Sequence, residues 1–182
     1  MTMGPRLRKL VLTAHVTTSV GWLGAVGVFL VLAIIGLAAQ DAQTVRGANL
    51  VMEPAAWFVP VPLSVASLLT GVVQSLGTAW GLLRHYWVLF KLLINVFSTV
   101  ALLLYMQSFA YLARVAGDPT ADLAMVRSTS PVLHATLALL LLLAATVLAV
   151  YKPRGMTRYG QRKQQSQRAV SRGYELKTLS QR

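Results

Sequence analysis

The chain has 182 residues, of which 55% are hydrophobic and 12% are charged, and 17 Lys and Arg against 5 Asp and Glu give a formal net charge of +12. Because it contains no cysteine, disulfides and thiolate ligands are excluded, and any bound metal would need His, Lys, Met, Tyr or carboxylate ligands. Four long apolar runs separated by short polar stretches are typical of an integral membrane protein.

A membrane-spanning helix needs about 20 mainly apolar residues. Four runs meet this length and predict helices over residues 10–39, 55–83, 87–112 and 132–151. Residues 1–151 are therefore expected to form an all-α bundle of four transmembrane helices. Pro60 and Pro62 are expected to bend the second helix near its start, because neighbouring helices can satisfy backbone groups freed at a kink.

The basic residues of the chain are unevenly distributed among the predicted turns and ends. Arg6, Arg8 and Lys9 precede the first helix, Arg84 lies between the second and third, and nine basic residues follow the fourth. Since Lys and Arg accumulate in cytoplasmic loops, both termini are expected to be cytoplasmic, in the inner membrane of a bacterial cell. This distribution explains the net charge by membrane topology, so the lipid bilayer is the expected partner and nucleic acid is not.

Residues 152–182 form a basic tail rich in Gln, Ser and Gly. The tail lacks an apolar periodicity with which to bury surface, so we expect it to be disordered or to lie on anionic lipids of the inner leaflet. The outer connections, residues 40–54 and 113–130, are expected to be short loops with no domain of their own.

Polar side chains inside a membrane span usually face the bundle interior and are functional candidates. On the first helix, His15 and Trp22 share one face, whereas Thr17, Gly21 and Gly24 form a small-residue face that would suit another protomer or a membrane partner. On the second helix, Gln74 is too large and polar for packing alone.

The third helix carries the strongest polar stripe of the sequence, with Arg84, Lys91 and Asn95 on one face. Lys91 has two interpretations: it lines an interior site, or its ammonium snorkels back to the interface. At about 1.5 Å per residue, His15, Gln74 and Lys91 lie roughly 8–12 Å in from the cytoplasmic ends, with His85 at the boundary. His134 lies near the outer surface, where a structural role is expected.

The segment from His15 to Trp22-Leu23-Gly24 resembles the first helix of copper-resistance CopD-like membrane domains and of HemJ-type membrane protoporphyrinogen oxidases. The stretch from His85 to Lys91-Leu92 is similar to the start of the corresponding helix in both groups. The resemblance implies a four-helix bundle and, for the HemJ-like relatives, a haem held by helix side chains. The matching residues are His15, Trp22, Gly24 and Lys91.

Two functions follow. The first is a redox-linked or haem-handling protein that binds haem b or a metal between its helices. In this hypothesis His15 is the axial ligand, Trp22 lies beside the porphyrin edge, and His85 or Lys91 is a second ligand or a partner of the propionates, which Arg84 would also neutralise. His15 and His85 are the candidate metal ligands.

The alternative is a non-catalytic membrane subunit or small transporter whose polar stripes serve helix packing. No catalytic motif of soluble enzymes and no pair of carboxylates within a span is found in the sequence. The sequence therefore leaves open whether the protein is an enzyme.

Overall fold

The computed structural model describes residues 3–78, 81–153 and 155–179, with side chains described as far as residue 173. The described residues form helices α1 (Pro5–Ala38), α2 (Ala42–Phe58), α3 (Pro60–Leu76), α4 (Tyr86–Gly117), α5 (Leu123–Val126), α6 (Ser130–Tyr151) and α7 (Arg158–Leu179). The predicted all-α class is confirmed. Residues 79–80 of the predicted second helix, and residues 154 and 180–182 of the predicted tail, lie outside the described residues.

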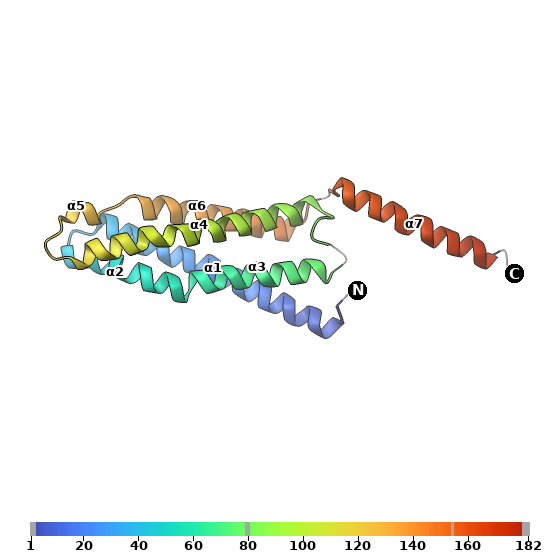
Figure 1. Ribbon diagram of the computed structural model, residues 1–182, viewed down its shortest axis with the longest axis horizontal. Coiled ribbons are helices and arrows are strands. Elements are labelled where there is room, and N and C mark those ends of the chain that lie inside the picture. Colours follow the sequence, from blue (N-terminus) through green and yellow to red (C-terminus); the bar gives the residue numbers. More distant parts are fainter. Residues whose placement is uncertain (1–2, 79–80, 154, 180–182) are drawn as a thin grey trace.

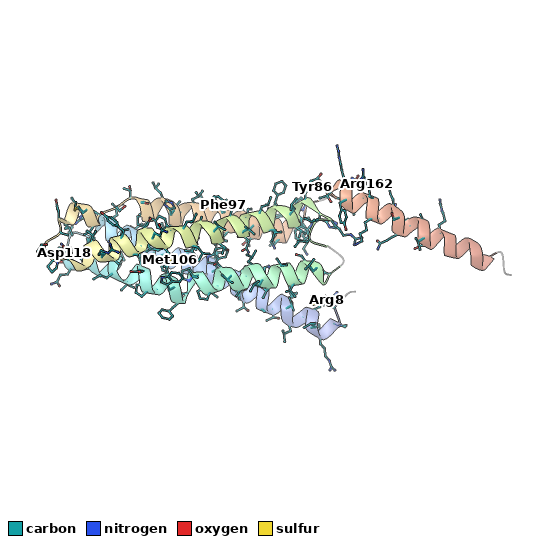
Figure 2. The ribbon with its side chains drawn as sticks, in the orientation of Figure 1. Arg8, Tyr86, Phe97, Met106, Asp118 and Arg162 are labelled. Carbon is teal, nitrogen blue, oxygen red and sulfur yellow. The ribbon has the colours of Figure 1, made fainter. Side chains whose placement is uncertain are left out.

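Four stretches are long and apolar enough to cross a membrane: α1, α2 with α3, α4, and α5 with α6, of 34, 35, 32 and 29 residues. They run antiparallel, and both termini lie at the same end of the bundle (Figure 1). We call this the basic end, because Arg6, Arg8, Lys9, Arg84 and Lys152 belong to it. Figure 2 shows Arg8 and Tyr86 toward this end and Asp118 at the opposite end.

The second span begins at Ala42, so the prediction of a loop over residues 40–54 is wrong. The Asp41 carboxylate accepts hydrogen bonds from Thr44 N at 2.8 Å and Thr44 Oγ1 at 2.7 Å and thereby caps the first turn of α2. Val45, Ala48, Asn49 and Met52 bury one face of α2, and polar residues such as Gln43, Thr44 and Arg46 interrupt the apolar residues of its first half. A search for uniformly apolar runs overlooks such an amphipathic helix.

The predicted bend falls at Val59, in the middle of the second span and not near its start. Val59 has φ −121° and ψ −74°, outside helical geometry, and separates α2 from α3. Pro60 follows at the first position of α3, where its missing N–H is tolerated. At its far end α3 stops at Leu76, before the predicted residue 83, because Gly77 ends the helix and Gly81 adopts a positive φ of 62°.

Two arginines form hydrogen bonds that hold the connections between helices at the opposite end. Arg127 donates to the carbonyl oxygens of Leu37 at 2.9 Å and Ala39 at 2.7 Å, at the end of α1. Arg46 of α2 donates to the carbonyl oxygens of Val115 and Ala116 in the last turn of α4. It also donates to those of Asp118 and Ala121 in the connection that follows. Guanidinium groups thus satisfy helix C-terminal carbonyls that would otherwise lack donors.

The core is divided along the bundle axis. Phe29, Met52, Tyr105 and Phe109 pack together in the half nearer the opposite end. Trp22, Val26 and Leu142 form a second cluster nearer the middle. The outer faces are apolar as well: in α6 only Pro131 and Leu142 are buried, so the rest of this helix is a wall for lipid or packing contact, as its Leu and Ala content predicts.

The tail differs from the sequence-based expectation, because residues Arg158–Leu179 form the helix α7. This helix projects away from the bundle at the basic end (Figure 1). Lys, Arg, Gln, Ala and Leu are strong helix formers, so a segment that buries little surface can still be helical. The lack of apolar periodicity in the tail argues against a helix packed on the bundle, but it does not argue against a helix that is surrounded by solvent.

Candidate functional site

His15 is bonded to the neighbouring helix α3. Its Nδ1 lies 3.2 Å from the Ser67 carbonyl oxygen and 3.2 Å from Thr70 Oγ1. Because a carbonyl only accepts, and the Thr70 hydroxyl already donates to the Ala66 carbonyl at 2.6 Å, we infer that Nδ1 carries the proton. In the neutral imidazole, Nε2 then keeps its lone pair.

The imidazole of His15 packs against Gly71, where the absence of a side chain leaves space for the ring. A Cβ built on Gly71 would lie 3.0 Å from His15 Cε1 and 3.4 Å from Nδ1, tighter than ordinary van der Waals contact for the first of these. The ring edge therefore rests directly on the α3 backbone, and a side chain at position 71 would push it away.

A hydrogen-bond network joins α1, α3 and α4 at this level. Ser67, which is fully buried, pairs its hydroxyl with Ser19 Oγ at 2.8 Å and accepts from Asn95 Nδ2 at 3.2 Å. We call His15, Ser19, Ser67, Thr70 and Asn95 the His15 network. Interhelical hydrogen bonds of this kind hold membrane helices together, at an average of about 0.6 kcal/mol each.

Lys91 lies one turn before Asn95 on α4 and is half-buried. Its ammonium lies 6.0 Å from the Trp87 ring centroid, one turn nearer the basic end, as a partly snorkelling side chain does. The ammonium therefore lies between the His15 network and the basic end.

Two of the predicted partners of His15 lie at the end of the bundle. His85 precedes α4 and forms an antiparallel bridge with Met156, and the Arg84 side chain donates to Gln167 Oε1 at 3.2 Å. His15, in contrast, forms its hydrogen bonds with Ser67 and Thr70 of α3. The structure does not bring His85 or Arg84 to His15.

Gln74 and Trp22 lie on either side of the His15 network along the bundle. Gln74 is half-buried on α3, one turn beyond Thr70 toward the basic end. Trp22 is 2% exposed and packs against Leu142 of α6, whereas His15 contacts α3. Leu63 of α3 also packs against the Trp22 cluster, but the hydrogen bonds of His15 are made with Ser67 and Thr70, one and two turns nearer the basic end.

The small-residue face predicted for α1 is divided. A Cβ built on Gly21 would lie 3.5 Å from Leu63 Cδ1 of α3, so Gly21 belongs to packing within the chain. Thr17 and Gly24 are exposed, with nothing within 4 Å of a Cβ built on Gly24.

A cavity of about 210 Å³, which sequence reasoning missed, lies between α1, α4, α6 and the bend of the second span. Four side chains with polar atoms contribute to its wall, namely Trp22, Ser98, Tyr105 and His134. His134 stacks on Tyr105 with ring centroids 4.1 Å apart, and its Nδ1 lies 2.9 Å from the Ser130 carbonyl oxygen. The residues come from helices far apart in the sequence, so no local motif signals the cavity.

The fold and the four apolar spans define an integral membrane protein with several membrane-crossing helices. No family model, curated protein or solved structure matches the chain. Among the described residues, no three His, Cys, Asp or Glu side chains come together as a metal-binding group. The resemblance to CopD-like and HemJ-type proteins stays a prediction.

Proposed function

We propose that this membrane protein binds an anionic, membrane-associated ligand in the half of the bundle near the basic end, with Lys91 as the partner of its negative charge. The observation that carries the proposal is a half-buried ammonium in a region without acids. Three of the five acids lie in the connections at the opposite end, one in α2 and one in the tail, namely Asp41, Asp118, Asp122, Glu53 and Glu175.

The charge of Lys91 has no anionic counterpart in this half of the bundle, because the acids of the described bundle helices and connections lie toward the opposite end. An unpaired cation in a low-dielectric environment is costly. A ligand carboxylate or phosphate bound beside Lys91 would remove that cost, which supports a site for an anionic group.

Haem b is the ligand that the sequence resemblance implies, and two features support it. A histidine whose Nδ1–H donates to a backbone carbonyl, as in His15, is held in the way common for metal-binding imidazoles, with Nε2 free to bind. Haem propionates are carboxylates that Lys91 would neutralise. A haem bound there would supply electron transfer and a redox-linked or haem-handling role. Since His85 and Arg84 lie at the bundle end, we assign the axial role to His15 alone.

The second candidate is a non-catalytic membrane subunit or small transporter. It is favoured by the His15 network, in which each side chain bonds across or along helices as packing alone requires. In this function His15 needs no ligand, and the protein is colourless.

An absorption spectrum of protein purified in detergent separates the two. We expect a Soret band that His15→Ala abolishes, that Lys91→Met weakens and that Lys9→Met, a control at an exposed lysine, leaves unchanged. A colourless protein that retains an anionic lipid in native mass spectrometry, lost in Lys91→Met but not in Lys9→Met, would support the anion site with lipid as its ligand. A colourless protein without any such anion would overturn the proposal in favour of the non-catalytic module.

The proposed location is the inner membrane of a bacterial cell, with both termini cytoplasmic. Support comes from the basic residues gathered at the end of the bundle that carries both termini. In that orientation the Lys91 site faces the inner leaflet, where the basic tail would meet anionic lipids.

A further inference from the structure

The cavity in the middle of the bundle carries an inference that goes beyond the proposed function, because neither His15 nor Lys91 lines it. Its wall is largely aromatic and aliphatic, with Phe29 from α1, Met52 from α2 and Phe109 from α4. It has no Lys, Arg, Asp or Glu in its described lining. A charged ligand would be unpaired there, so the occupant is an uncharged molecule.

Two polar groups on this wall lack a hydrogen-bond partner. Trp22 Nε1 and Ser98 Oγ are buried without partners among the described residues, and their side chains are 2% and 5% exposed. Leaving such a group unsatisfied in an apolar interior is unfavourable. An indole N–H can only donate and a serine hydroxyl can donate, so a ligand whose acceptor oxygen reaches these two atoms would satisfy them.

We infer from two lining residues that the cavity opens to the outer surface of the bundle between α4 and α6. Phe97 of α4 and Leu137 of α6 both line it, and they are 60% and 54% exposed on the apolar exterior. An occupant can therefore enter from the lipid phase without passing the charged ends. The volume of about 210 Å³ is below the roughly 300–1,000 Å³ of pockets for drug-sized ligands, and suits one ring or one chain end.

We propose that this cavity binds the carbonyl-bearing end of an uncharged, membrane-dissolved molecule, with Trp22 Nε1 and Ser98 Oγ donating to its oxygen. A monocyclic quinone and the ester of a neutral glycerolipid are two sources of that chemistry. The site is independent of His15 and Lys91, so His15→Ala and Lys91→Met should leave binding unchanged whatever the outcome for the anion site.

Duroquinone and dioctanoylglycerol are suitable probes for the detergent-purified full chain. We expect duroquinone to quench tryptophan emission with a saturable component, and dioctanoylglycerol, which is not a quencher, to compete with it. Saturable quenching without competition assigns the site to a quinone. Retention of dioctanoylglycerol alone in native mass spectrometry assigns it to a lipid ester. Absence of binding for both probes overturns the proposal.

Thr99 supplies a matched control, because its hydroxyl is also buried without a partner but does not line the cavity. We expect Ser98→Ala to weaken binding about three- to tenfold, as for loss of one hydrogen bond, and Thr99→Ala to leave it unchanged. Ala138→Leu, which fills the cavity, should remove the saturable component, with Ala101→Leu as a second filling variant if the first unfolds. Equal effects of Ser98→Ala and Thr99→Ala would overturn the assignment.

Discussion

At the scale of single residues, the packing of His15 depends on the absence of a side chain at position 71. Gly71 and Gly27 are both half-buried helical glycines, but only Gly71 meets the imidazole, whereas nothing lies within 4 Å of a Cβ built on Gly27. The two positions therefore separate the effect of helix propensity from that of the contact with His15.

We expect Gly27→Ala to stabilise the bundle by up to about 1 kcal/mol, the propensity difference between the two residues in a helix. Gly71→Ala should give no gain or a net loss, because the imidazole must move and its bonds to Ser67 and Thr70 lengthen. Thermal unfolding in detergent measures both. Equal gains for the two variants would show that His15 does not press on α3.

The candidate site shows which residue-level inferences sequence alone supports. The spacing of polar residues predicted that His15, Gln74 and Lys91 lie at similar depth, because helical periodicity and rise are fixed. It did not predict that Trp22 turns toward α6, or that Ser98 and Trp22 face a common cavity. Those relations depend on how helices rotate and cross, which side-chain packing decides.

At the scale of elements, the start of α2 rests on the Asp41 cap. The hydrogen bond from the Thr44 hydroxyl, followed by that from the Thr44 backbone, holds the pKa of Asp41 below its ordinary value. A carboxyl whose pKa is lower in the folded state stabilises it above the unfolded pKa, and this stabilisation is lost as the pH falls through the lowered folded value.

Asp41→Ala should therefore loosen the first turn of α2 at neutral pH and have less effect as the solution becomes more acidic than that lowered pKa. Amide hydrogen exchange over Ala42–Val45 at a series of pH values measures this, relative to an unchanged turn of α6. Asp41→Asn should retain most of the cap, since its amide oxygen still accepts from Thr44. A pH-independent difference between wild type and Asp41→Ala would contradict the titration of the cap.

The helix boundaries show where hydropathy is a sufficient guide and where it is not. The four spans were predictable because membrane thickness requires long apolar runs. The first half of the second span was not, since α2 is amphipathic and buries Asn49 against Gly36 of α1. The helix α7 was missed for the opposite reason, because it is polar throughout and follows local propensity.

Three contacts of the tail with the bundle lie near its start. Thr157 N donates to the Arg84 carbonyl at 3.0 Å, Thr157 Oγ1 donates to the Leu83 carbonyl at 2.6 Å, and Gly160 packs on the Arg84 backbone. Truncation after Gly160 keeps these three contacts and removes the exposed hydrogen bond from Arg84 to Gln167 Oε1. An exposed contact of this kind contributes little, so the thermal unfolding temperature of the bundle in detergent should change little. A truncation that removes Thr157 as well should lower it. A large loss on truncation after Gly160 would mean that the rest of α7 packs on the bundle.

At the scale of the whole molecule, an even number of spans brings both ends of the chain to the same side. The two ends of the bundle also differ in charge: basic residues gather where the termini lie, whereas the opposite end carries Asp41, Asp118 and Asp122 with Arg46 and Arg127. Arg46 and Arg127 are bonded to carbonyl oxygens at and after helix C-termini, so their charges serve the fold of the connections, and Arg114 in the last turn of α4 is a third arginine at that end.

Because Lys and Arg are generally retained on the cytoplasmic side of a membrane, we expect the basic end to lie on that side. Reporter fusions at Ser128, in the connection between α5 and α6, and after α7 should lie on opposite sides of the membrane, with the C-terminal fusion cytoplasmic. Replacing Arg6, Arg8 and Lys9 together by Gln should leave this orientation in place, because Arg84 and the tail still outnumber the basic residues at the other end. Reporters on the same side of the membrane would contradict the four-span topology. A cytoplasmic Ser128 fusion with a C-terminal fusion on the other side would show the opposite orientation, and Lys91 would then not face the inner leaflet.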